Sequence, residues 1–162
     1  IRIKLTLEGG TMLEYTIVEK AAFTVMGRSR TFNAETSYAE IPKFWQEHMA
    51  SGEREKVCGM YGVCLDGDGK HFEYLIADNY IPQKEVPAGY VTKTIPAGTW
   101  AIFPCKGDLP RTLQDVNTMI WSEWLPNCKE YKLAGNYNIE AYFPPDESGV
   151  TYSEIWIPIE KL

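Results

Sequence analysis

The chain has 162 residues, which is typical of a single domain, and its formal net charge is −6. Nucleic-acid-binding proteins usually carry a basic patch or stripe, and the sequence shows none. Nothing in it resembles a signal peptide, and no apolar run approaches membrane-spanning length, so we expect a cytoplasmic protein with no membrane partner.

The first half of the chain predicts strands on either side of one helix. Residues 1–14 indicate a linker or an edge strand, and residues 15–32 are rich in β-forming residues and predict one strand with a kink. Residues 36–52 place apolar side chains at helical spacing and end at a glycine. Residues 57–65 and 70–81 predict two short strands joined by the turn DGDG.

The second half repeats this pattern. Residues 89–105 predict a long strand broken at Pro96 to Gly98, and residues 108–126 predict a helix. The apolar stripe of that helix consists of Leu113, Val116, Ile120 and Trp124. Two last strands, 137–143 and 152–159, are joined by the turn PPDESG.

The order strand–helix–strand–strand therefore occurs twice, over about 15–81 and 89–160. We predict an α+β fold of two βαββ repeats related by a pseudo-twofold axis. The antiparallel sheet is expected to have both helices on one face and a ligand groove between the halves. In this alignment of the repeats, Tyr61 corresponds to Glu140.

Aromatic residues make up 13% of the chain, with five Trp, ten Tyr and six Phe. A surplus beyond the needs of the core would suit a pocket that binds flat apolar ligands or cations. The acidic balance favours cationic or neutral small molecules over anions.

Neither a metal nor a cofactor is expected. The four cysteines include no CxxC pair and there are only two histidines, so the sequence predicts no zinc site. The DGDG turn lacks the twelve-residue loop and closing glutamate of a calcium site. We expect the cysteines to be reduced, as in bacterial cytosolic proteins.

The strand 137–143, YNIEAYF, carries a carboxylate among aromatic and aliphatic residues. Side chains alternate between the faces of a strand, so Glu140 and Tyr142 share one side. We expect this side to face away from the helices, together with Glu154 and Trp156 of the last strand. Trp100 is expected on the same mixed face.

The opposite, aliphatic face is expected to lie under the helices. It consists of Ile139, Ala141, Phe143, Ile155, Ile157 and Ile159, with Ala101 and Phe103 on the preceding strand. Two interpretations of the mixed face remain open at this point. It is either a solvent-facing sheet surface with single exposed aromatic residues, or the wall of a cleft with an acid on its floor.

An ordered set of short segments resembles the GyrI-like effector-binding domains of AraC-type and multidrug-sensing MerR-type bacterial regulators. The segments are FTVMGRSRTF, IPKFWQEHM, YGVC, FEYLIA, IPAGTWAIFPCKG, IWSEWLP and IEAYFP…SEIWIPI, within residues 15–162. The head IRIKLTLEGGTMLEY resembles the junction that follows the DNA-binding domain in AraC-type members. The resemblance implies that DNA is reached only through such a domain, outside this chain.

The resemblance also implies a set of ligand-binding residues. The glutamate of the family's E-x-Y strand corresponds to Glu140, with Tyr142 as its partner. The aromatic walls of the family's pockets correspond less closely to Tyr61, Trp100, Trp121 and Trp156. Trp121 could instead belong to the helix core, and Glu154 could be either a rim acid or part of the groove.

Two functions are compatible with these features. The first is a ligand-sensing domain for transcription regulation, which binds an apolar or cationic aromatic small molecule. The second is an enzyme, because some stand-alone relatives look like hydrolases of cyclopropane-containing genotoxins. In that case Glu140 would act as a general acid or base on attacking water. No nucleophile–base pair is visible in the sequence.

Overall fold

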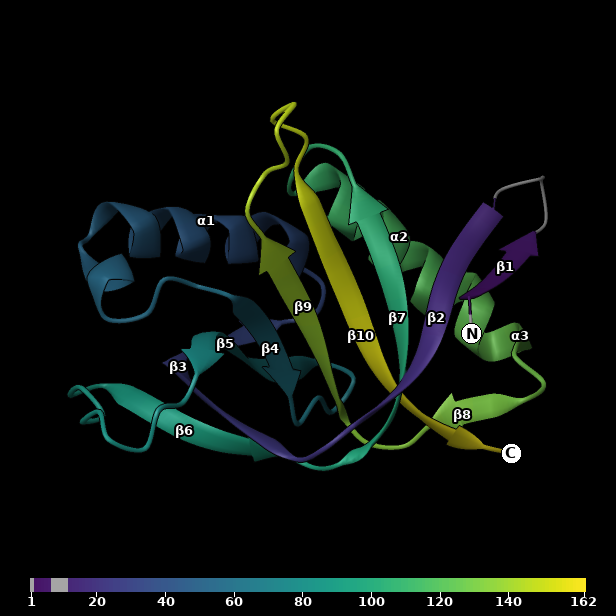
Figure 1. The fold of residues 1–162 in the computed structure, drawn as a ribbon, viewed down its shortest axis with the longest axis horizontal. Helices are drawn as coiled ribbons and strands as arrows, with labels where there is room; N and C mark the ends of the chain where they lie inside the picture. The colour runs from purple at the N-terminus through teal and green to yellow at the C-terminus, as the bar shows by residue number, and fades with distance from the viewer. Residues whose placement is uncertain (1, 7–11) are drawn as a thin grey trace. The chain divides into compact units, whose positions relative to one another are not determined.

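The chain forms two compact units (Figure 1). The structure is a computed structural model that describes residues 2–6 and 12–162. Unit 1 comprises Ile1–Lys20 and Gly98–Leu162, and unit 2 comprises Ala21–Ala97. Each unit pairs antiparallel strands with helical segments, so the predicted α+β class is confirmed.

Unit 1 contains a sheet with the order β1-β2-β7-β10-β9, and β8 pairs with the end of β10. Its strands are β1 (Arg2–Thr6), β2 (Met12–Lys20), β7 (Gly98–Lys106), β8 (Tyr131–Leu133), β9 (Tyr137–Phe143) and β10 (Tyr152–Lys161). Its helical segments are α2 (Arg111–Met119), the π-helical turn η2 (Ile120–Trp124) and α3 (Leu125–Asn127).

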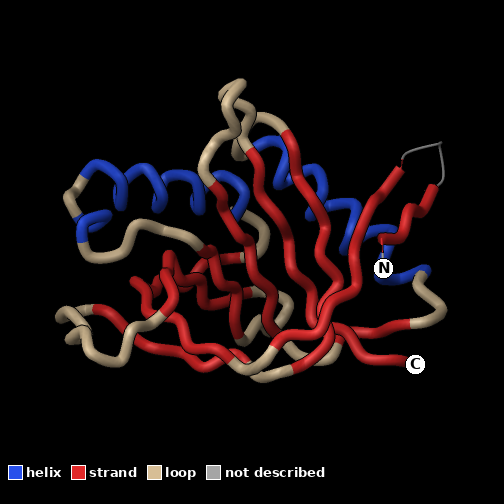
Figure 2. Tube along the Cα trace, viewed as in Figure 1, coloured by secondary structure: helices blue, strands red, loops and turns tan. Residues whose placement is uncertain are grey.

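Unit 2 contains a second run of strands in the order β4-β5-β3-β6. Its strands are β3 (Phe23–Asn33), β4 (Tyr61–Leu65), β5 (His71–Asn79) and β6 (Tyr90–Ile95). Its helical segments, blue in Figure 2, are α1 (Ser37–Ala50) and the short 3-10 helix η1 (Glu53–Glu55). Among the helices that the structure describes, none is long and apolar enough to cross a membrane.

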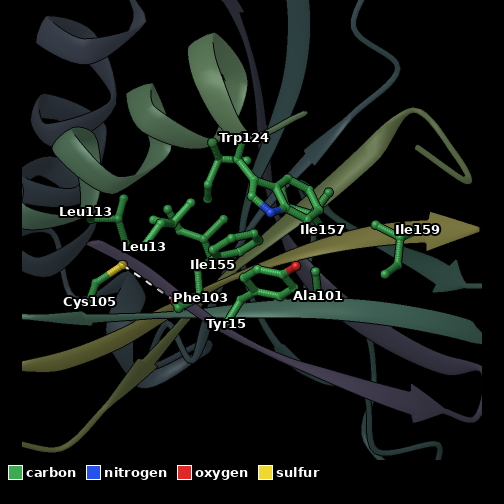
Figure 3. Close-up of a cluster of buried hydrophobic side chains, with 11 residues drawn as sticks. Leu13, Tyr15, Ala101, Phe103, Cys105, Leu113, Trp124, Ile155, Ile157 and Ile159 are labelled. Atoms are coloured by element: carbon green, nitrogen blue, oxygen red, sulfur yellow. Dashed lines mark hydrogen bonds between the residues drawn. The ribbon is translucent and has the colours of Figure 1, made fainter. Parts of the chain in front are cut away.

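The core of unit 1 lies between its sheet and its helical segments (Figure 3). The strands contribute Leu13, Tyr15, Ala101, Phe103, Cys105, Ile155, Ile157 and Ile159, and the helical segments contribute Leu113, Ile120 and Trp124. The Trp124 ring packs edge-on against Phe103, with centroids 5.0 Å apart, and against Tyr15 at 5.2 Å. The predicted helix stripe and the predicted position of the three isoleucines of β10 are therefore confirmed.

The core of unit 2 gathers aromatic side chains beneath α1. Phe32 of β3 lies 5.7 Å from Phe44 of α1 and 6.0 Å from Tyr74 of β5, measured between ring centroids. Met26, Val57, Ile76 and Tyr90 complete this cluster. The order β3–α1–β4–β5 is the predicted strand–helix–strand–strand pattern. In unit 1 the order is β7, the helical segments α2 to α3, and then β8, β9 and β10, so the short strand β8 is an addition to the predicted pattern.

The predicted single strand 15–32 is wrong, because the chain divides at Ala21 and Ala22. The part before them, β2, pairs with β7 in unit 1, and the part after them, β3, pairs with β5 in unit 2. The predicted break at Pro96 likewise separates β6 from β7. Of the predicted linker or edge strand 1–14, the structure describes β1 as an edge strand paired with β2, and residues 7–11 lie outside the described residues.

Candidate ligand-binding site

Glu140 lies on the helix-covered face of the unit 1 sheet. In the register of β9 and β10, Glu140 pairs with Ile155 and Tyr142 pairs with Ser153. Directly paired residues of antiparallel strands lie on the same face, and Ile155 belongs to the core beneath the helical segments. The prediction that Glu140 and Tyr142 face away from the helices is therefore wrong.

The prediction that Ile139, Ala141 and Phe143 lie under the helices is wrong as well. Ile139 pairs with Trp156 and Ala141 pairs with Glu154, so these residues face away from α2. The Phe143 ring packs against Tyr152 of the same face in a tilted arrangement, with ring centroids 5.4 Å apart. Alternation correctly predicted which residues of β9 share a side. The prediction of which side faces the helices was wrong, because the side that carries Glu140, and not the aliphatic side, lies under them.

The Glu140 carboxylate is buried, with 8% of the residue exposed, and it has a hydrogen-bond donor beside it. The Tyr142 hydroxyl donates to Glu140 Oε2 over 2.9 Å, and the Tyr142 ring packs against the core of unit 1. A buried carboxylate is costly unless it is hydrogen-bonded or paired, and Tyr142 provides part of that compensation. The solvent-facing alternative for Glu140 is thereby excluded.

The charge of Glu140 acts on the neighbouring core. Cys105 and Ser153 are directly paired on β7 and β10 and are both buried on the helix-covered face. Burial, followed by the negative charge of Glu140, raises the pKa of the Cys105 thiol to about 12. Cys105 is therefore a neutral thiol at physiological pH. The effect also shows that the Glu140 carboxylate is close enough to the core of unit 1 to act on it electrostatically.

Trp121 lies on the π-helical turn that follows α2. Its neighbours Ile120 and Trp124 are buried in the core, whereas Trp121 is 37% exposed and its indole Nε1 donates to Asn117 Oδ1 over 3.0 Å. Pro126, which has no backbone N–H, follows this turn. π-Helical turns often occur at functional sites. Trp121 is thus a partly exposed ring on the π-helical turn η2, and other residues of this turn pack against the sheet face that carries Glu140.

Trp100 and Trp156 lie on the opposite face of the unit 1 sheet, as predicted from alternation. Trp100 pairs with Pro158 on β10, and the rings of Trp100 and Trp156 lie 6.3 Å apart in an edge-on arrangement. Tyr137 joins them at 5.6 Å from Trp100. Since Trp100 is 1% exposed and Trp156 is 7% exposed, neither is a single exposed aromatic residue. They do not share a face with Glu140.

Glu154 lies on the same face as Trp156 and is held by two aromatic donors. The Tyr152 hydroxyl donates to Glu154 Oε2 over 2.7 Å, and Trp156 Nε1 donates to Glu154 Oε1 over 3.0 Å. Glu154 is half-buried, which is intermediate between the rim acid and the pocket acid that the sequence left open.

Tyr61 belongs to unit 2 and faces away from α1. Gly62 pairs with Ile76 of the core, so Tyr61 and Val63 lie on the other side of β4. The Tyr61 ring lies 6.3 Å from Phe23, and burial raises the pKa of its hydroxyl. Glu140 faces the helical segments of unit 1, whereas Tyr61 faces away from the helix of unit 2. The two residues therefore do not occupy equivalent positions, and the predicted alignment of the repeats is wrong at this strand.

The helix face of unit 2 carries an ionic cluster that the sequence analysis did not identify. The Arg30 guanidinium lies 4.2 Å from the ring centroid of Phe44, and that of Arg28 lies at 5.3 Å. Both arginines pair with Glu47, at 3.0 Å and 3.4 Å. Hydrogen bonding to Arg30 lowers the pKa of Glu47. The alternating arginines in FTVMGRSRTF and the helical spacing of Phe44 and Glu47 were the signal for it.

The described residues contain no group of three or more His, Cys, Asp or Glu side chains that could hold a metal ion. All four cysteines are free thiols.

Residues 16–159 match the family model Cass2, described as integron-associated effector binding protein. No curated protein matches the chain. Among solved structures, SAV2435 bound to tetraphenylphosphonium is 20% identical with a TM-score of 0.78, covering 90% of this chain and 93% of that one.

Two further solved structures have the same fold. An integron cassette protein from the mobile metagenome of Vibrio cholerae is 19% identical with a TM-score of 0.68, covering 90% of this chain and 95% of that one. The C-terminal domain of EcmrR is 18% identical with a TM-score of 0.57, covering 93% and 99%. The chain therefore belongs to the Cass2 family of integron-associated effector-binding proteins, and it has the fold of the GyrI-like effector-binding domains that its sequence resembles.

Proposed function

We propose that this chain is the ligand-sensing domain of a bacterial AraC-type transcription regulator, and that it binds an apolar or cationic aromatic small molecule at Glu140. The observation that carries the proposal is a buried carboxylate on the helix face of β9, held by the Tyr142 hydroxyl, in a chain of an effector-binding family. In a site of low dielectric constant, one carboxylate discriminates strongly between cations and anions.

The site that we propose in unit 1 consists of Glu140, Tyr142 and Trp121. The Tyr142 hydroxyl donates to Glu140 Oε2 and so orients the carboxylate within the buried site. Trp121 supplies an exposed ring on the helical turn whose Ile120 and Trp124 pack against the same face of the sheet. A ring and a carboxylate together suit a ligand that is both aromatic and positively charged. A role of Tyr61 in ligand binding stays a prediction from the sequence.

The helix face of unit 2 is a poorer candidate for an external cation. Its aromatic ring, Phe44, is already covered by the guanidinium groups of Arg28 and Arg30, and Glu47 already accepts hydrogen bonds from both. The chain's own cations thus use the ring and the carboxylate that a ligand would need.

Regulation requires that the ligand favour one state of the whole regulator over another. EcmrR, whose C-terminal domain has the same fold, has also been solved in complex with DNA. We propose a similar arrangement here: a DNA-binding domain outside this chain, in the bacterial cytoplasm, reads the occupancy of the ligand site. By itself the chain would bind ligand and have no affinity for DNA.

Two ions of the same shape and opposite charge test this proposal. SAV2435 has been solved with tetraphenylphosphonium, and tetraphenylborate is its anionic counterpart. We expect the purified chain to bind the cation at least about tenfold more tightly in calorimetric titrations at low salt. Equal affinity for the two ions would refute the cation-reading role. Turnover of a cyclopropane-containing compound, lost in Glu140→Gln, would instead support the hydrolase.

A further inference from the structure

Four side chains form a second ring-and-carboxylate group on the face of unit 1 away from α2. The Lys20 ammonium lies 4.1 Å from the ring centroid of Trp156. The indole Nε1 of Trp156 donates to Glu154 Oε1 over 3.0 Å, and the Tyr152 hydroxyl donates to Glu154 Oε2 over 2.7 Å. A cation therefore rests on a ring whose N–H is bound to a carboxylate.

The strands place these groups by alternation and register. Tyr152, Glu154 and Trp156 are alternate residues of β10 and share one face. Lys20 pairs with Gly98, which is on the same face of β7 as Trp100, and β7 lies between β2 and β10. Lys20 therefore lies on the same face of the sheet as Trp156.

The chemistry of this group is that of a cation site. An ammonium over the face of a Trp ring is the most favourable arrangement of this kind, and a carboxylate at the edge of the ring adds negative potential. Lys20 supplies the cation from within the chain. Any external ammonium has to compete with the ammonium of Lys20. The apparent dissociation constant of the external ammonium equals the intrinsic one divided by the fraction of molecules in which Lys20 leaves the ring uncovered.

We propose that the Trp156 face is a second cation-binding site, for a small alkylammonium group, and that Lys20 fills and thereby blocks it. This site is separate from Glu140, which lies on the other face of the sheet. Lys20 acts as a built-in competitor that keeps small amines off the Trp156 ring. The strength of a cation–π contact implies that removing Lys20 raises the affinity for an external ammonium by roughly tenfold.

The test is a titration of the whole chain with n-butylammonium, which copies the end of a lysine side chain. The readout is the Trp156 indole N–H resonance in ¹H–¹⁵N spectra, assigned with Trp156→Phe. We expect a saturable shift in Lys20→Ala at roughly tenfold lower concentration than in the natural chain. Lys20→Arg, which keeps a cation on the ring, is expected to behave like the natural chain.

Two controls keep the outcome decisive. Uncharged n-butanol is expected to leave the Trp156 resonance unchanged, and Lys20→Arg is expected to need as much n-butylammonium as the natural chain. Lys20→Gln, which retains much of the side-chain stem, replaces Lys20→Ala if the latter does not fold. The proposal is refuted if n-butylammonium shifts the resonance equally in the natural chain and the variant, or if n-butanol shifts it as much as n-butylammonium.

Discussion

Replacing Glu140 by Gln is expected to weaken the binding of tetraphenylphosphonium by about thirtyfold. A charge separation of roughly 8 Å at an effective dielectric constant of about 20 corresponds to about 2 kcal/mol. Gln keeps the size of the side chain and can still accept the hydrogen bond of Tyr142, so the change removes charge with little loss of packing. Affinity for tetraphenylborate is expected to rise, and both affinities can be measured by calorimetry.

Glu154→Gln is the matched control for this experiment. Glu154 also accepts a hydrogen bond from a tyrosine two residues away, Tyr152, but it lies on the opposite face of the sheet from Glu140. We expect the affinity of Glu154→Gln for tetraphenylphosphonium to stay within about threefold of that of the natural chain, because this charge lies on the other face of the sheet from the proposed site and is partly screened by solvent. If Glu154→Gln lost more affinity for tetraphenylphosphonium than Glu140→Gln, the acid that binds the cation would be Glu154, on the face away from α2, and the proposed site would be wrong.

Replacing Trp124 by Ala is expected to destabilise the fold by roughly 3–5 kcal/mol, because it removes the largest side chain from the core of unit 1. Trp124 is 1% exposed and packs edge-on against Tyr15 and Phe103. The cavity that remains is bordered by rings of two neighbouring strands, which cannot collapse into it without moving the sheet. The free energy of unfolding is measured by urea denaturation.

Trp121 provides the comparison on the same helical turn. Trp121→Ala truncates a ring that is 37% exposed, and we expect a loss below about 1 kcal/mol. If Trp124→Ala fails to fold, Trp124→Phe retains part of the edge-on packing and reports the same trend. Trp121→Ala is also expected to weaken tetraphenylphosphonium binding, whereas Trp124→Phe is not. Equal stability losses at Trp121 and Trp124 would contradict the described core.

The strand that carries three isoleucines was easier to predict than the strand that carries Glu140. On β10, Ile155, Ile157 and Ile159 occupy one face without interruption, so alternation alone identifies the side that packs against the helical segments. On β9 both faces are buried, with Ile139 on one and Glu140 on the other. Hydrophobicity then gives no preference, and only the register with β10 decides which face meets the helices.

The division of the chain shows a similar contrast. Pro96 marks the boundary between β6 and β7 in the sequence, because proline ends strands visibly. The boundary between β2 and β3 consists of Ala21 and Ala22, which carry no turn signal. The π-helical turn was equally hidden, because the spacing of Ile120 and Trp124 fits an α-helix as well.

The most direct test of the account locates the bound ligand on one face of the unit 1 sheet. Intermolecular NOEs can be measured between the phenyl protons of tetraphenylphosphonium and the assigned aromatic side chains of the chain. We predict NOEs to Tyr142, which touches Glu140 on the helix-covered face. NOEs to Trp100 and Trp156 on the opposite face, with none to Tyr142, would contradict the account.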